Sequence, residues 1–133
     1  MRREKKMYNV IVADDEKNIR EGIVELIEWE KLGCKVCASM QNGAQVLKYL
    51  EEEKIHVDII ITDIKMPIMD GMELIGMLNE RFPDIKVIIL TAYSDFTYAQ
   101  QAIKFQVSDF VVKNDFFLEL PRACLKNILS CSF

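Results

Sequence analysis

Acidic side chains follow two of the apolar, β-branched segments of this chain. The segment 10–13 ends in Asp14-Asp15-Glu16, and the segment 59–61 is followed by Thr62 and Asp63. Because the carboxyl ends of parallel strands meet at one edge of a sheet, we expect these carboxylates to lie close together. Crowded carboxylates raise one another's pKa unless a cation neutralises them. Oxygen ligands of this kind suit Mg²⁺, so the sequence predicts a magnesium site.

Two further polar residues follow the next buried segments. Thr91 comes after the segment 85–90, and Lys113 comes after the segment 109–112. An ionised Asp63 could act as a nucleophile toward a phosphoryl group, whose charge the metal and Lys113 would neutralise. The hydroxyl of Thr91 could donate a hydrogen bond to a phosphoryl oxygen. These residue types together favour phosphoryl transfer to an aspartate.

The hydrophobic pattern that positions these residues alternates between strands and helices. Buried strands are predicted at 8–13, 35–39, 57–61, 85–90 and 109–112. Helical spacing is seen in 17–29, 43–50, 71–82, 95–103 and 118–129. We therefore expect an α/β, flavodoxin-like (βα)5 fold, a doubly wound parallel sheet with strand order 2-1-3-4-5.

The last predicted helix contains Pro121. Proline lacks an amide donor and is tolerated only in the first turn of a helix. We therefore expect the regular part of this helix to begin near Leu118 to Leu120, or the helix to be kinked.

Length and composition describe an ordinary globular domain. The 133 residues are enough for one core, which makes 1–133 a single domain, with 1–6 expected to be a disordered leader. The net charge of -4 argues against nucleic-acid binding by these residues. No apolar run approaches the length of a membrane span, so we expect a cytoplasmic protein without membrane contact.

The spacing Cys34-x-x-Cys37 raises the question of a metal site. The segment reads as a short strand, in which positions three apart point to opposite faces. We therefore interpret the cysteines as small interior hydrophobes rather than metal ligands.

Four motifs in this chain resemble the response regulator receiver domain of two-component signalling. They are Asp14-Asp15-Glu16, Asp63-x-x-Met66-Pro67-x-x-Asp70-Gly71, Thr91-Ala92 and Lys113. The resemblance covers nearly the whole chain. The stretches 19–33 and 93–99 further resemble receivers that precede AraC-type helix-turn-helix domains in transcriptional regulators of Gram-positive bacteria.

The resemblance implies a phosphoacceptor and a set of metal ligands. Asp63 would accept the phosphoryl group. Asp15, Asp63 and the backbone carbonyl of Lys65 would bind Mg²⁺ directly, and Asp14 would act mainly through water. Apart from assisting its own phosphorylation and slow dephosphorylation, the chain would not be an enzyme.

The resemblance also implies a switch. Thr91 and Lys113 would contact the phosphoryl group, and Phe110 would turn inward when Thr91 moves toward it; Phe110 could equally be an ordinary core aromatic. The family usually has proline after the lysine, whereas this chain has Asn114. Because a non-proline cis bond costs about 3 kcal/mol, we expect a trans peptide here, which puts the direction of Lys113 in question.

The implied function is signal transfer from a sensor histidine kinase to a transcriptional output. Phosphorylation would change a dimer or interdomain surface, with a homodimer as the expected product. DNA would be bound only through a C-terminal helix-turn-helix domain absent from this chain. The alternative is a stand-alone receiver that acts by protein–protein interaction.

Two other classes of protein fit the sequence less well. A flavodoxin-like electron carrier needs a phosphate-binding loop where this chain has Asp14-Asp15-Glu16, and a colourless purified protein would exclude it. An aspartyl-phosphate phosphatase needs a second catalytic acid two residues after Asp63, where this chain has Lys65; enzymatic phosphomonoester turnover would revive it.

Overall fold

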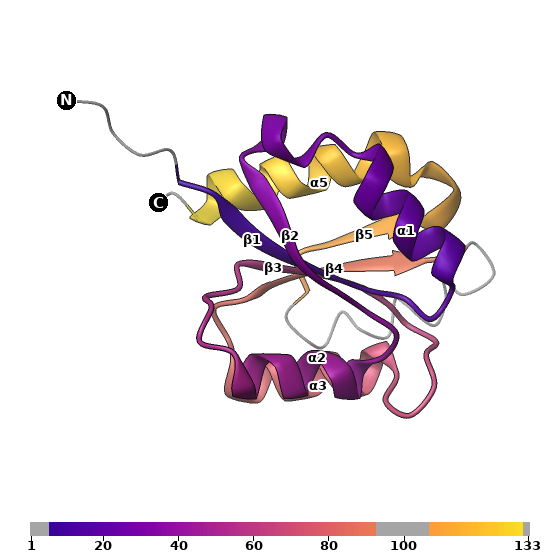
Figure 1. Cartoon of the computed structure of the whole chain (residues 1–133), viewed down its shortest axis with the longest axis vertical. Coiled ribbons are helices and arrows are strands. Elements are labelled where there is room, and N and C mark those ends of the chain that lie inside the picture. The colour runs from indigo at the N-terminus through magenta and orange to yellow at the C-terminus, as the bar shows by residue number, and fades with distance from the viewer. Residues whose placement is uncertain (1–5, 93–106, 132–133) are drawn as a thin grey trace.

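Five parallel strands form one sheet at the centre of the fold (Figure 1). The computed structural model describes residues 6–92 and 107–131. The strands are β1 (Tyr8–Ala13), β2 (Cys34–Met40), β3 (Ile59–Asp63), β4 (Lys86–Thr91) and β5 (Asp109–Val112). Their order is β2-β1-β3-β4-β5, and each neighbouring pair is parallel. The predicted flavodoxin-like fold and strand order are confirmed.

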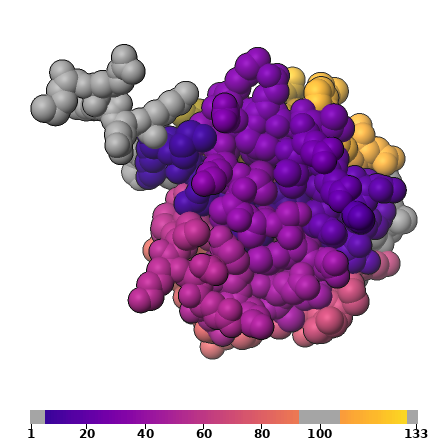
Figure 2. Space-filling view, in the orientation of Figure 1, coloured from indigo at the N-terminus to yellow at the C-terminus, as the bar shows by residue number. Residues whose placement is uncertain are grey.

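Helices cover both faces of this sheet, which explains its continuous apolar strands. The helices α1 (Lys17–Leu26) and α5 (Phe116–Cys131), with the 3-10 turn η1 (Trp29–Leu32), lie on one face. The helices α2 (Gly43–Glu52) and α3 (Gly71–Arg81) lie on the other (Figure 1). In the space-filling view, atoms of the N-terminal half cover most of the visible face (Figure 2). The predicted helix at 95–103 falls outside the described residues.

The strand β3 shows why these sequences form a two-sided core. All five of its residues are buried. Ile60 belongs to the cluster under α2 and α3, while Ile59 and Ile61 belong to the cluster under α1 and α5. Successive residues of a strand point to opposite faces, so an unbroken isoleucine run packs against the helices on both sides of the sheet.

The first helix is shorter than the predicted 17–29. It ends at Leu26, and η1 begins at Trp29. The chain turns here because Ile27 and Trp29 both enter the core. The indole Nε1 of Trp29 donates a hydrogen bond to the carbonyl of Ile23 at 3.2 Å. That bond satisfies one of the carbonyl groups left open at the end of the helix.

The last helix begins earlier than the expected range of Leu118 to Leu120. It begins at Phe116, after the 3-10 turn η4 (Lys113–Asp115), and continues through Pro121. Pro121 removes the amide that would bond to the carbonyl of Phe117. The side chain of Phe117 lies at the exposed side of the helix. Within residues 6–92 and 107–131, no helix has the length and apolar character of a membrane span.

Of the three cysteines whose side chains the structure describes, Cys34 and Cys124 are buried, as predicted, and Cys37 is half-buried. Cys34 is fully buried in the cluster under α1 and α5, whereas Cys37 packs against the cluster on the opposite face. Cys124 is buried in α5, and these three thiols are free. The two residues of the Cys34-x-x-Cys37 motif therefore do not form half of a metal site.

Candidate functional site

The carboxyl edge of the sheet brings four predicted residues to the same rim. Asp14 follows β1, Asp63 ends β3, Thr91 ends β4 and Lys113 follows β5. These strands are neighbours in the sheet, and all four side chains are buried. Ligands collect at this edge of open parallel sheets, so the four residues occupy the expected location for chemistry.

The ammonium of Lys113 is the centre of the site. Its Nζ atom lies 2.9 Å from Oδ2 of Asp63, 2.9 Å from Oε1 of Glu16 and 3.1 Å from Oδ2 of Asp14. Burial disfavours its charge, but the bonds to Asp63 and Glu16 outweigh that effect and raise the pKa of Lys113. The lysine is therefore a fixed positive charge among three carboxylates.

Both carboxylate oxygens of Asp63 have partners. Oδ1 accepts the backbone N–H of Ile64 at 2.7 Å, and Oδ2 accepts Lys113. Burial raises the pKa of Asp63, the bonds from Lys113 and Ile64 lower it, and the charge of Asp15 raises it, with a net shift upward. Asp63 is thus a buried carboxylate held in one orientation.

Asp14 is buried with one unsatisfied oxygen. Its Oδ1 accepts the backbone N–H of Glu16 at 2.9 Å, whereas Oδ2 receives no hydrogen bond of acceptable geometry from any described residue. Burial raises the pKa of Asp14 to about 6, despite the lowering effects of the Glu16 amide and Lys113. The Lys113 ammonium lies 3.1 Å from Oδ2 as an ion-pair partner, but this oxygen accepts no hydrogen bond from a described residue and can therefore bind a further cation.

The donor set fits a hard divalent cation. Ligand atoms of Asp14, Glu16 and Asp63 lie within 4.8 Å of one another. Three ionised carboxylates around one ammonium leave two negative charges without compensation. Oxygen donors and this charge match Mg²⁺, and the open oxygen of Asp14 gives it a point of attachment.

Glu16 joins the acidic cluster in addition to the residues assigned to the metal. The side chain of Asp15 is exposed, and the acidic side-chain atoms that lie within reach of one another come from Asp14, Glu16 and Asp63. The charge of Asp15 still raises the pKa of Asp63. The metal-ligand roles of Asp15 and of the Lys65 backbone carbonyl stay predictions. The motif Asp14-Asp15-Glu16 contains Glu16, for which the sequence alone indicates no role. The run of three acids was its signal. The turn into α1 places the exposed Glu16 side chain within hydrogen-bond distance of Lys113.

The predicted switch residues occupy adjacent strands. The hydroxyl of Thr91 donates to the carbonyl of Ala92 at 3.1 Å. Phe110 is half-buried, pairs with Ile89 of β4 and packs against the cluster under α2 and α3. Phe110 thus occupies a core position, and its role in switching stays a prediction.

The peptide between Lys113 and Asn114 is trans, as expected for a non-proline residue, since residues 6–92 and 107–131 contain no cis peptide. Lys113 nevertheless reaches Asp63 at 2.9 Å. The substitution of asparagine for the usual proline therefore leaves the lysine directed at the site.

The loop after Asp63 is held close to the strand that it leaves. Gly71 donates its N–H to the carbonyl of Ile64 at 2.7 Å, and an added Cβ at Gly71 would lie 2.1 Å from the carbonyl oxygen of Asp63. Asp70 caps α3 by accepting the N–H of Glu73 at 2.9 Å. The motif Asp70-Gly71 therefore starts a helix directly against the backbone of Asp63.

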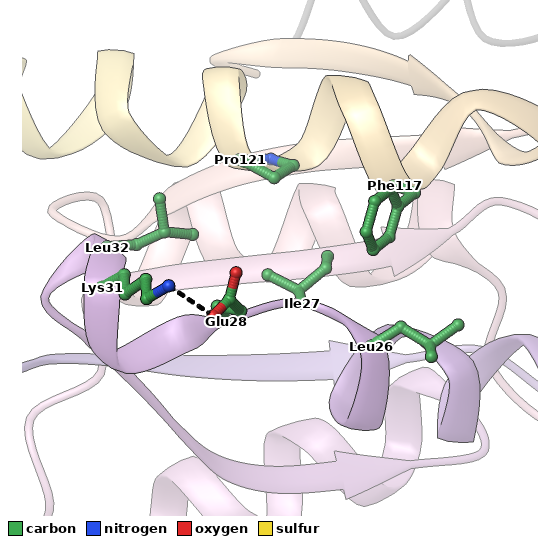
Figure 3. A pocket seen from close by; sticks show the side chains of 7 residues that line it. All are labelled: Leu26, Ile27, Glu28, Lys31, Leu32, Phe117 and Pro121. Carbon is green, nitrogen blue, oxygen red and sulfur yellow. Dashed lines mark ion pairs between the residues drawn. The ribbon is translucent and has the colours of Figure 1, made fainter.

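A separate pocket of about 240 Å³ lies between the C-terminal end of α1 with η1 and the helix α5. Figure 3 shows its lining, which is Leu26, Ile27, Glu28, Lys31, Leu32, Phe117 and Pro121. Glu28 and Lys31 form an exposed ion pair of 2.7 Å at its rim. Asp14 lies at the other end of α1, roughly 14 Å away along the helix axis, so the pocket is not part of the acidic site.

The chain belongs to the response regulator receiver domain family, whose model matches residues 10–121. The transcriptional regulatory protein YesN of Bacillus subtilis, itself uncharacterized, is 38% identical over 107 residues, covering 80% of this chain and 28% of that protein. The transcriptional regulatory protein HptR of Staphylococcus aureus is 32% identical, covering 80% of this chain and 41% of that protein. The chain thus spans less than half the length of these relatives.

Solved structures agree with this assignment. The receiver domain of AraT, a response regulator from Geobacillus stearothermophilus, superposes with a TM-score of 0.83 at 34% identity, covering 95% of this chain and 98% of that one. A response regulator receiver domain protein from Clostridium thermocellum gives 0.82 at 28% identity, covering 94% and 97%. Both similarities extend over nearly the entire fold.

Proposed function

We propose that Asp63 of this receiver accepts a phosphoryl group from a sensor histidine kinase. The observation that carries the proposal is the buried Asp63 carboxylate, held 2.9 Å from the Lys113 ammonium at the carboxyl edge of the sheet. In the transfer, an oxygen of Asp63 attacks phosphorus while the bond between phosphorus and the histidine nitrogen breaks. The imidazole leaves with that electron pair.

The site residues have separable parts in this reaction. Lys113 would donate one of its N–H groups to a phosphoryl oxygen. Thr91 would rotate its hydroxyl from the Ala92 carbonyl toward the same group. Asp14 and Asp63, and by family resemblance Asp15 and the carbonyl of Lys65, would hold Mg²⁺. The bound ion would supply charge neutralisation during transfer.

The output would be a changed surface. Phosphorylation adds nearly two negative charges beside Thr91 and Lys113, which can bias a two-state element. Movement of Thr91 and Phe110 would alter a dimer or interdomain surface and so control transcription through a DNA-binding domain. The relatives YesN and HptR, named as transcriptional regulatory proteins, favour this output.

Beryllofluoride titration in the presence of Mg²⁺, followed by amide NMR, tests the proposal. The wild type should show saturating shifts around Asp15, Thr91, Phe110 and Lys113, and Asp63→Asn should show none. A wild-type protein that stays folded but does not respond would contradict phosphorylation. That result would favour the alternative, a receiver that acts by constitutive protein–protein interaction.

A further inference from the structure

Glu16 belongs to the acidic cluster of the site, but neither the family resemblance nor the proposed phosphoryl transfer assigns it a role. Its Oε1 accepts a hydrogen bond from Lys113 Nζ at 2.9 Å, the same distance as the bond from Lys113 to Asp63. An ammonium has three N–H donors. Glu16 therefore occupies one of the three donors that Lys113 could otherwise offer to a phosphoryl oxygen.

The carboxylates around Lys113 differ in their freedom to move. The side chains of Asp14 and Asp63 are 0% and 5% exposed, whereas that of Glu16 is 61% exposed. A buried carboxylate that loses its cation keeps an uncompensated charge in the protein interior, which is strongly unfavourable. An exposed carboxylate that loses its cation returns to water at little cost. Glu16 is thus the partner that Lys113 can leave most easily.

The backbone directs Glu16 toward this contact. Glu16 is the residue before α1 and makes no side-chain hydrogen bond to cap that helix. Its N–H is bound by Asp14 at 2.9 Å, so the Asp14 carboxylate fixes the backbone from which the Glu16 side chain extends. The side chain is consequently available to the lysine.

We infer that Glu16 is a positioning residue that holds Lys113 in the unphosphorylated state and releases it to the phosphoryl group. The inference rests on the proposed function, in which Lys113 contacts that group. The Glu16–Lys113 pair stabilises only the resting state. Its loss therefore shifts the equilibrium toward the phosphorylated arrangement.

The test compares Glu16→Gln with the wild type and with Glu21→Gln. The control removes the same charge from α1, where Glu21 pairs with Lys17 at 3.9 Å and not with Lys113. Beryllofluoride binding with saturating Mg²⁺ should be roughly two- to fivefold tighter in Glu16→Gln, the size expected from an exposed ion pair. Glu21→Gln should bind like the wild type.

A second readout follows the lysine directly. In the protein without Mg²⁺ and beryllofluoride, the Lys113 ammonium resonance should shift and its protons should exchange faster with water in Glu16→Gln, but not in Glu21→Gln. This measurement does not require phosphorylation. A wild type that fails to bind beryllofluoride would overturn the proposed function, while the ammonium spectrum would still report whether Glu16 holds Lys113.

Two results would overturn the inference. Unchanged beryllofluoride affinity and an unchanged ammonium resonance in Glu16→Gln would show that Glu16 does not hold the lysine. A Mg²⁺ affinity weakened more than about tenfold in Glu16→Gln, measured by titration with Mg²⁺ alone, would show that Glu16 is a metal ligand.

Discussion

At the scale of single residues, folding and function make opposite demands on Asp14. Burial raises its pKa to about 6, compared with about 4 for an ordinary aspartate. Between these values the folded state binds the proton more tightly than the unfolded state. The penalty for ionising Asp14 is therefore absent below pH 4 and complete above pH 6, where it destabilises the fold.

Asp14→Asn should therefore stabilise the metal-free protein at pH 7.5, by on the order of 2–3 kcal/mol, the free-energy equivalent of that pKa shift. An asparagine oxygen can still accept the Glu16 amide. The gain should shrink at pH 5, where Asp14 of the wild type is largely protonated when folded. Urea unfolding at both pH values measures it; an equal gain at both, or a loss at pH 7.5, would contradict the argument.

At the scale of elements, the start of α3 depends on a glycine and the middle of α1 does not. A Cβ at Gly71 would meet the Asp63 carbonyl oxygen at 2.1 Å, and backbone atoms there can move apart only by shifting the loop. A Cβ at Gly22 would meet Phe116 Cζ at 3.7 Å, an ordinary contact between α1 and α5. The two positions therefore form a matched pair for alanine substitution.

Gly71→Ala should destabilise the protein by about 2 kcal/mol or more, because overpacking displaces the loop beside Asp63. Gly22→Ala should stabilise it by about 1 kcal/mol, since alanine is the better residue in a helix interior. Thermal unfolding monitored by circular dichroism measures both. If both variants shifted stability in the same direction, the packing described at Gly71 would be wrong.

The ends of α1 and α5 show how packing sets element boundaries. Helical spacing continued to Trp29, but the helix stops at Leu26 because Trp29 bonds back to Ile23. Propensity indicated a late start for α5, but the 3-10 turn η4 leads directly into a helix at Phe116. In both cases contacts between segments outweighed local preference.

At the scale of the whole molecule, the acidic site joins three strands. Asp14 follows β1, Asp63 ends β3 and Lys113 follows β5, so the cluster exists only when the sheet is assembled. A cation that binds this cluster binds the folded state and not the unfolded chain. Its binding free energy therefore adds to the stability of the domain.

Mg²⁺ should raise the unfolding temperature, by an amount equivalent to about 2.7 kcal/mol at a concentration of one hundred times its dissociation constant. EDTA should reverse the effect. Asp63→Asn should lose most of it, and an equal ionic strength of NaCl should not reproduce it. Thermal unfolding scans with and without Mg²⁺ measure the change in unfolding temperature. Equal stabilisation of the wild type and Asp63→Asn would show that the ion binds outside the acidic cluster.

The sequence alone determined the sheet and most of the site. Unbroken β-branched runs such as 59–61 predict strands covered on both faces, and right-handed crossovers restrict their order. Parallel strands share a carboxyl edge, so residues directly after them must meet. That reasoning identified Asp14, Asp63, Thr91 and Lys113, which the structure brings to one rim.

Only the tertiary structure decided which way side chains point after a strand ends. Glu16 rather than Asp15 contacts Lys113, because the turn into α1 directs alternate acids of one run differently. The surroundings of the Asp14 Oδ2 atom, which accepts no hydrogen bond but lies 3.1 Å from Lys113, likewise depend on a residue distant in the sequence. Periodicity records which face of an element is buried, but the direction of a loop side chain follows from three-dimensional contacts between residues far apart in the chain.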